Sequence, residues 1–370
     1  MNGTALLRRE RLTAADQPRG TAQVTPINDD AAMLREAANL TRDLNVADAR
    51  IYWVDLIGSA AVGYAAFAFA VGTGSPWQAV AAVIVAILAF YRAGSFIHEL
   101  THLKRGAVPG FRWAWNALIG VPLLVPSFAY EGVHNQHHAK RYYGTIDDPE
   151  YLPLALMKPW TLPAVLAVAI LAPVLLIVRF GVLGPLSMLS RRLRRFVVER
   201  YSGLQLNPLF RRPAPEGEFR RDWIIQEIAC SIWAISLLAL VGSGIVPVRD
   251  FALGLCVASG AMLLNQVRTL VAHLWENDGE PMSVTAQYLD SVNVPPPAAL
   301  PALWAPVGLR YHALHHLLPG LPYHALGEAH RRLCAALDPG SIYHESSHRG
   351  LSPLMARLAA STLTNRRKSA

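Results

Sequence analysis

Long apolar runs alternate with arginine-rich segments along this chain, and each run has about the length of a membrane span. The first two runs occupy residues 51–72 and 76–97, and two more occupy residues 223–242 and 251–272. A helix needs about 20 mostly apolar residues to cross the hydrocarbon layer of a bilayer. The pattern therefore predicts four transmembrane helices, arranged in two pairs.

A fifth apolar run, residues 161–189, differs from the other four because polar and helix-breaking residues interrupt it. Pro173, Arg179 and the pair Gly184-Pro185 divide this run, and proline removes a backbone donor from a helix interior. We therefore expect a re-entrant hairpin or an interfacial pair of helices here, rather than a single crossing.

The basic residues predict how the chain is oriented in the membrane. Seven arginines precede residue 51, whereas the turn between the first two runs, residues 73–75, has none. Positive charge close to a span favours the cytoplasmic side, so the N-terminus is expected there, together with the basic segment 191–221 and the C-terminal end. The alanine-rich and arginine-rich composition suggests a bacterial inner membrane.

These patterns predict an all-α membrane protein with about four transmembrane helices, a re-entrant or interfacial segment and a cytoplasmic helical cap. We expect a largely disordered cytoplasmic tail over residues 1–48, a membrane domain over residues 49–335 and a cytoplasmic tail over residues 336–370. The composition agrees, since 52% of the 370 residues are hydrophobic and only 16% are charged. The formal net charge of +8 lies beside the spans, which favours anionic lipid headgroups over nucleic acid as its partner.

The histidines are the residues that suggest a function, because they are clustered along the chain. Of 13 histidines, nine lie in four short segments next to predicted spans on the cytoplasmic side: the segments HELTH, HNQHH, VAHLWEN and HALHH. Residues three or four apart on a helix share a face, so each segment with several histidines presents its imidazoles together. The candidate metal ligands are His98, His102, His134, His137, His138, His273, His312, His315 and His316.

Nine imidazoles are more than one metal ion can hold. Neutral imidazole suits iron, copper, nickel and zinc, and a first-row metal offers about six positions, so two metals are the economical interpretation. Nearby acidic residues could fix the imidazole tautomers: Glu99, Glu131, Asp147, Asp148 and Glu276. The four remaining histidines are expected at the surface or in supporting positions: His324, His330, His344 and His348.

Two other classes of protein compete with this interpretation. The segment HELTH also satisfies the H-E-x-x-H pattern of zinc metalloproteases, in which Glu99 would be the general base. That mechanism needs only three protein ligands and a water, and it leaves seven histidines unexplained. A non-catalytic metal-binding membrane protein is the second alternative, whereas metal transport is disfavoured because the spans carry few ionisable residues.

At this point the sequence resembles the membrane fatty acid desaturase-like family of di-iron oxygenases, whose mark is three histidine boxes on the cytoplasmic face. The flanking segments "YGTIDDPEYLP", "NQVRTLVAHLWEN" and "HHLLPGLPYHALGEAHRRL" also resemble that family. The resemblance covers most of residues 50–335 and implies the nine histidines above as ligands of two iron ions. Thr269 stands where some relatives place an asparagine near the metal.

The resemblance implies an O2-dependent reaction on a fatty acyl or similar lipid chain. We expect desaturation, with hydroxylation of a lipid, alkane or carotenoid as the alternative. Because no haem or iron-sulfur segment is recognised, electrons are expected from a separate carrier such as a ferredoxin, attracted by the basic cytoplasmic face. Small residues in the first span could make room for the lipid or could serve close helix packing: Gly58, Ala61, Gly63, Ala65 and Ala66.

Overall fold

The structure is a computed structural model, and it describes residues 27–368. Within that range the regular secondary structure is helical, with isolated β-bridges and no strand. The all-α prediction is therefore confirmed.

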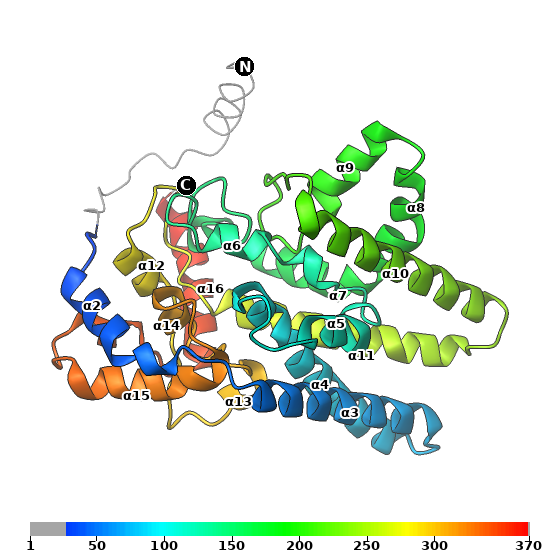
Figure 1. The fold of residues 1–370 in the computed structure, drawn as a ribbon, viewed down its shortest axis with the longest axis horizontal. Helices are drawn as coiled ribbons and strands as arrows, with labels where there is room; N and C mark the ends of the chain where they lie inside the picture. The colour runs from blue at the N-terminus through cyan, green and yellow to red at the C-terminus, as the bar shows by residue number, and fades with distance from the viewer. Residues whose placement is uncertain (1–26, 369–370) are drawn as a thin grey trace.

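Four long helices form the part of the molecule that points away from the cap (Figure 1). They are α3 (Ala49–Gly72), α4 (Pro76–His102), α10 (Gly217–Gly242) and α11 (Val248–Leu270). The side chain of Asp48 accepts a hydrogen bond from the Arg50 amide at the start of α3, and a proline occupies the first turn of α4, where no donor is lost. All four are long and apolar enough to cross a membrane, as the sequence predicts.

The fifth apolar run folds as α7 (Thr161–Val178), followed by a π-helical turn η5 (Arg179–Leu183) and the short helix α8 (Gly184–Ser187). By length and composition it is a fifth candidate span. Helix α7 packs along α11, and after it the Arg179 guanidinium donates to the Tyr201 carbonyl at 2.7 Å, at the end of helix α9 (Arg191–Tyr201). Residues 161–187 thus form one continuous helical run and not the hairpin or pair of helices that we expected, and the number of helices that cross stays a prediction.

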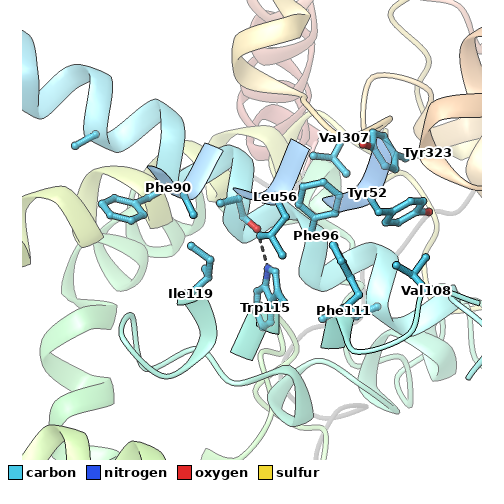
Figure 2. Close-up of a cluster of buried hydrophobic side chains, with 14 of the residues drawn as sticks. Tyr52, Leu56, Phe90, Phe96, Val108, Phe111, Trp115, Ile119, Val307 and Tyr323 are labelled. Carbon is cyan, nitrogen blue, oxygen red and sulfur yellow. Dashed lines mark hydrogen bonds between the residues drawn. The ribbon is translucent and has the colours of Figure 1, made fainter. Parts of the chain in front are cut away.

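Aromatic packing fixes α4 against α3 and the following segment. The cluster in Figure 2 joins side chains of α3 and α4 with those of α5 (Phe111–Trp115), and Trp115 donates its indole N–H to the Ala93 carbonyl at 2.8 Å. Leu56, Phe96 and Trp115 are fully buried. Burial of large aromatic side chains is a main source of stability, so the end of α4 is held in a defined position.

Short helices and loops form the cap beside the ends of α4 and α11 (Figure 1). They are η3 (Ser127–Ala129), α6 (Val133–His137), η4 (Leu154–Leu156), α12 (Val284–Asp290), α13 (Pro301–Trp304), α14 (His312–Leu317), η6 (Tyr323–Ala325), α15 (Leu326–Ala336), η7 (Ile342–Ser346) and α16 (Leu351–Lys368). The π-helical turn η2 (Asn116–Gly120) instead packs against the middle of α3 and α4, where the Tyr64 hydroxyl donates to the Leu118 carbonyl at 2.6 Å.

The two segments expected to be tails both contain helices where the structure describes them. Residues 1–26 lie outside the described part, but α2 (Ala31–Leu40) and η1 (Arg42–Leu44) follow. Met33 and Ala37 of α2 are buried in the same hydrophobic cluster as α14 and α15, and Leu358 of α16 is buried in another. The expectation of disorder is therefore wrong for residues 31–44, because an apolar face of α2 completes the cap.

Candidate metal centre

The nine candidate histidines converge in the cap from four separate segments. We call the first group site A: His98, His102, His134, His138 and His315. The donor nitrogens of site A all lie within 4.8 Å of one another. Site A thus combines the last turns of α4 with α6 and α14, which lie far apart in sequence.

The second group, site B, lies on the other side of the same histidine cluster. His137, His273 and His316 also have donor nitrogens within 4.8 Å of one another. His312 completes site B, because its Nε2 lies 3.1 Å from Nε2 of His273 and 3.2 Å from Nε2 of His316. The rings of His138 and His316 stack with centroids 4.3 Å apart, so sites A and B adjoin.

Local backbone geometry puts these rings in place. The helix α4 carries His98 and His102 one turn apart, so both rings point to the same side. Gly132 has a φ of 76°, a conformation that glycine adopts freely, and it turns the chain directly into α6. His273 follows the end of α11 and is held by an antiparallel bridge to Ser291.

The spacing between imidazole nitrogens fits metal coordination. Two nitrogens bound at right angles, each about 2.1 Å from one metal, lie about 3.0 Å apart. In site A, Nε2 of His138 lies 3.0 Å from Nε2 of His134 and 3.1 Å from Nε2 of His315. One pair at this distance could share a proton, but a whole group of converging imidazoles has too few protons and acceptors to satisfy itself.

Unpaired buried nitrogens support the same conclusion. Within the described residues, both ring nitrogens of His98 and Nε2 of His102 are buried without a hydrogen-bond partner. A buried polar group without a partner costs free energy, and a metal bound to one nitrogen of each ring reduces that cost. The donor set of neutral nitrogens therefore fits a transition metal, and it does not fit Ca²⁺ or Mg²⁺, which take oxygen ligands.

Carboxylates orient the imidazoles from the far side of the rings. In site B, Nδ1 of His137 lies 2.9 Å from Asp148, which has no solvent exposure, and Nδ1 of His273 lies 2.9 Å from the Tyr143 hydroxyl. Tyr143 in turn donates to Asp290 at 2.9 Å. Such contacts fix the tautomer so that Nε2 is free to bind metal.

In site A, the ring of His134 is oriented in the same way. Nδ1 of His134 lies 3.0 Å from Glu150 and 2.9 Å from the Tyr130 hydroxyl. Burial raises the pKa of Glu150 to about 7. The same effect raises the pKa of Asp290 to about 6, because a low-dielectric site disfavours the charged form.

Electrostatics also keep most of these imidazoles neutral. Burial, followed by repulsion from neighbouring imidazoles, holds the pKa of His134, His138 and His315 well below the usual value. For His137, burial lowers the pKa, but the Asp148 carboxylate outweighs it and leaves the pKa above the usual value. Neutral imidazole is the form that binds metal.

The acidic residues expected to orient the histidines divide into two groups. Asp148 contacts His137 as expected. Glu99 lies 3.9 Å from His98 Nδ1 but is held instead by the Tyr52 hydroxyl at 2.5 Å. Glu131 pairs with Arg112, Glu276 pairs with Arg357, and Asp147 is exposed.

Sequence reasoning did not single out Glu150, Asp290 or Tyr143. Glu150 follows the second histidine box closely and could have been found from its position in "DDPEY". Asp290 lies 17 residues beyond His273, and only the fold brings it to the site.

The four remaining histidines lie outside sites A and B. His330 is buried, and its Nδ1 lies 2.8 Å from the Tyr343 hydroxyl. His324 accepts a hydrogen bond from the Asp48 amide at 3.0 Å, while His344 lies near the Asp338 carbonyl.

The fold and the histidine centre together define a membrane-helical protein whose buried imidazoles could hold transition metals. The model of the fatty acid desaturase family matches residues 74–348. A ceramide hydroxylase from Caulobacter vibrioides (strain NA1000 / CB15N) is 51% identical over 322 residues, which covers 87% of this chain and 92% of the relative. The chain belongs to the fatty acid desaturase family, and it is an enzyme of that oxidoreductase family.

Proposed function

We propose that this protein is a membrane-bound, di-iron, O2-dependent lipid hydroxylase that acts on a ceramide or a closely similar lipid. Hydroxylation was the alternative in our sequence interpretation. The similar ceramide hydroxylase favours it over the desaturation that we expected first. The observation that carries the proposal is the convergence of nine histidines in two adjoining groups in a chain so similar to a hydroxylase.

The reaction needs an oxidant stronger than any side chain. No protein acid or base removes hydrogen from an unactivated methylene, whereas two irons held by sites A and B would supply the activation of O2 that this step needs. The overall reaction consumes one lipid C–H bond, one O2, two electrons and two protons, and it forms one lipid C–OH and one water. The lipid carbon is oxidised, and O2 is reduced.

The protein's own contribution is to position the groups and to exclude water. We assign site A to one iron and site B to the other, with Asp148, Asp290 and Glu150 keeping the Nδ1 protons on His137, His273 and His134. Seven of the nine histidines are buried, which keeps bulk water away from the reacting carbon. Since α4 and α11 both end at the centre, a lipid chain can approach from the bilayer.

Electrons are proposed to come from a separate acidic carrier such as a ferredoxin, with the active site on the cytoplasmic side of a bacterial inner membrane. The support is the arginine-rich helix α9, on which Arg191, Arg192 and Arg195 are exposed. Opposite charges accelerate association at low salt. A turnover rate that does not respond to ionic strength would contradict this docking mode.

The zinc protease alternative is weakened by the position of Glu99. A general base must face the metal-bound water, but one oxygen of Glu99 accepts from both the Tyr52 hydroxyl and the Tyr323 amide, at 2.5 and 3.1 Å. His98 and His102 also share their site with three further histidines, which leaves no coordination position for the water that a zinc protease needs.

The direct test is expression in a host that makes ceramide, in parallel with a His315→Ala variant, under ¹⁸O2. Lipid mass spectrometry should show a new ceramide species heavier by one ¹⁸O atom with the wild type and none with the variant. A species lighter by two hydrogen atoms would instead establish desaturation. An unchanged lipid profile with an active electron donor present would contradict both readings.

A further inference from the structure

A cavity where the cap helix α13 meets α3 and α4, away from the histidines, contains an ion pair. It has a volume of about 430 Å³ and lies between α3, α4 and α13, within the size range of small-molecule sites. Its apolar walls include Val62 and Leu303, which are 51% and 52% exposed. In a bilayer these side chains face lipid, so the cavity opens toward the hydrocarbon.

The polar end of this cavity is formed by Asp55 and Arg92. Arg92 donates from Nε and Nη2 to the two oxygens of Asp55 at 2.7 and 2.5 Å, a bidentate arrangement. Asp55 also accepts from the hydroxyls of Ser59 and Tyr323, at 3.2 and 2.9 Å. The carboxylate is therefore saturated with donors, and it balances the guanidinium charge.

Arg92 keeps one donor group free. Nη1 has no acceptor among the described residues, and the Arg92 side chain is 39% exposed, compared with 14% for Asp55. Asp55 and Arg92 both lie inside helices, α3 and α4, that are long and apolar enough to cross a membrane. Charged residues inside membrane-spanning helices are costly and usually functional.

The cavity is connected to the histidine centre through Tyr323. The Tyr323 hydroxyl donates to Asp55, its amide donates to Glu99, and Glu99 follows His98. Figure 2 shows Tyr323 beside Tyr52, whose hydroxyl also donates to Glu99. The Tyr91 hydroxyl donates to the Trp304 carbonyl at 2.7 Å, which fastens α13 beside α4.

We propose that this cavity binds the neutral polar group of the lipid substrate, an amide or a hydroxyl, through the free Nη1 donor of Arg92. The inference rests on the proposed function, since it names the part of that substrate which the protein recognises. A phosphate is disfavoured because Asp55 already neutralises Arg92, so an anion would bring an unbalanced charge into the membrane. A carbonyl or hydroxyl oxygen needs only the one donor that Arg92 offers.

Gly58 gives a way to fill the cavity without disturbing the fold. It lines the cavity, and a Cβ added there meets no atom within 4 Å. Leucine is also a better helix former than glycine, so Gly58→Leu should fold. Gly72→Leu is the matched control, because Gly72 is also in α3, has equally open space and lies outside the cavity.

The experiment uses purified full-length protein in nanodiscs and a photoactivatable ceramide, compared with photoactivatable phosphatidic acid of the same chain length. Ceramide should label peptides of α3, α4 or α13, and unlabelled ceramide should compete. Gly58→Leu should reduce this labelling about tenfold, while Gly72→Leu should not. The neutralised pair Asp55→Asn with Arg92→Gln should weaken labelling about tenfold as well, through loss of the charge-assisted donor.

The outcomes separate this proposal from the proposed function. Labelling needs no turnover, so competed labelling in a protein that hydroxylates no lipid supports the cavity and contradicts the function. Hydroxylation by Gly58→Leu with an unchanged KM, together with unchanged labelling, overturns the cavity alone. Equal labelling by both lipids without competition means surrounding bilayer lipid only, and it also overturns the proposal.

Discussion

Sites A and B use the same ligand chemistry but differ in how the protein holds the rings. Site B is enclosed: its four histidines are buried, and His137 and His273 contact Asp148 and the Tyr143–Asp290 pair. In site A, His102 and His138 are only half-buried, and Glu150 orients His134 alone. Site B is therefore preorganised, whereas site A is more open and takes two of its ligands from the long helix α4.

The largest expected effects come from removing one ligand from each site. His315→Ala in site A and His316→Ala in site B should each reduce activity to below about 1%, because a second-shell change alone costs about 10–100-fold. Metal content of the purified variants should fall as well. His344→Ala is the control, since it lies outside both sites, and loss of activity there would contradict the site assignment.

A chelator should distinguish the two sites in the wild type. Because site B is enclosed and site A is partly exposed, metal should leave in two phases, with site A emptied first. Metal content measured against time of chelation tests this. A single phase with both metals lost together would remove the contrast between the sites.

Substitution of an orienting carboxylate should weaken metal binding more at site B than at site A. Asp148→Asn should weaken metal binding at site B about 10–100-fold, because both Asp148 oxygens contact His137 and one also accepts the Gly144 amide. Glu150→Gln should weaken site A less, since Tyr130 still contacts His134. Metal affinities from competition with a chromophoric chelator give the comparison, and an equal effect of both variants would contradict it.

A smaller effect is expected from Tyr143→Phe. This change removes one hydroxyl that contacts both His273 and Asp290, at a cost of about 1 kcal/mol, or roughly fivefold in affinity at site B. Tyr142→Phe is a suitable control, because Tyr142 is adjacent in sequence and is not among the hydrogen-bond partners of either site. If the two variants bind metal alike, Tyr143 has no orienting role.

The smallest effect concerns a buried histidine that needs no metal. Burial lowers the pKa of His330 to about 4, below the ordinary value of about 6.5. Between these pH values the unfolded chain binds a proton that the folded protein does not, so stability falls as the pH falls through this window. The apparent Tm of His330→Gln should therefore decrease less between pH 7 and pH 5 than that of the wild type, and parallel curves would contradict this.

The sequence predicts the long helices and singles out the nine histidines because both are encoded by local spacing. Apolar runs of span length and imidazoles at helical intervals need no knowledge of the tertiary fold. The contact of Asp290 with Tyr143, 147 residues away in the chain, depends on how α12 packs and could not be predicted.

Tertiary packing also decides how the expected tails fold and where the cavity lies, so the sequence does not predict either. Met33 and Ala37 have an apolar spacing that a short helix can bury, but their partners in α14 and α15 are known only from the fold. Among the small residues of the first span, Gly58 lines a cavity, whereas Gly63 packs closely against Phe90. Sequence alone does not tell these two roles apart.

Metal analysis of the purified protein, combined with X-ray absorption at the iron edge, tests the central claim most directly. We expect about two irons per chain, each with a nitrogen-rich ligand shell, and loss of iron in both His315→Ala and His316→Ala. One zinc per chain, or two irons that remain bound in both variants, would contradict the account.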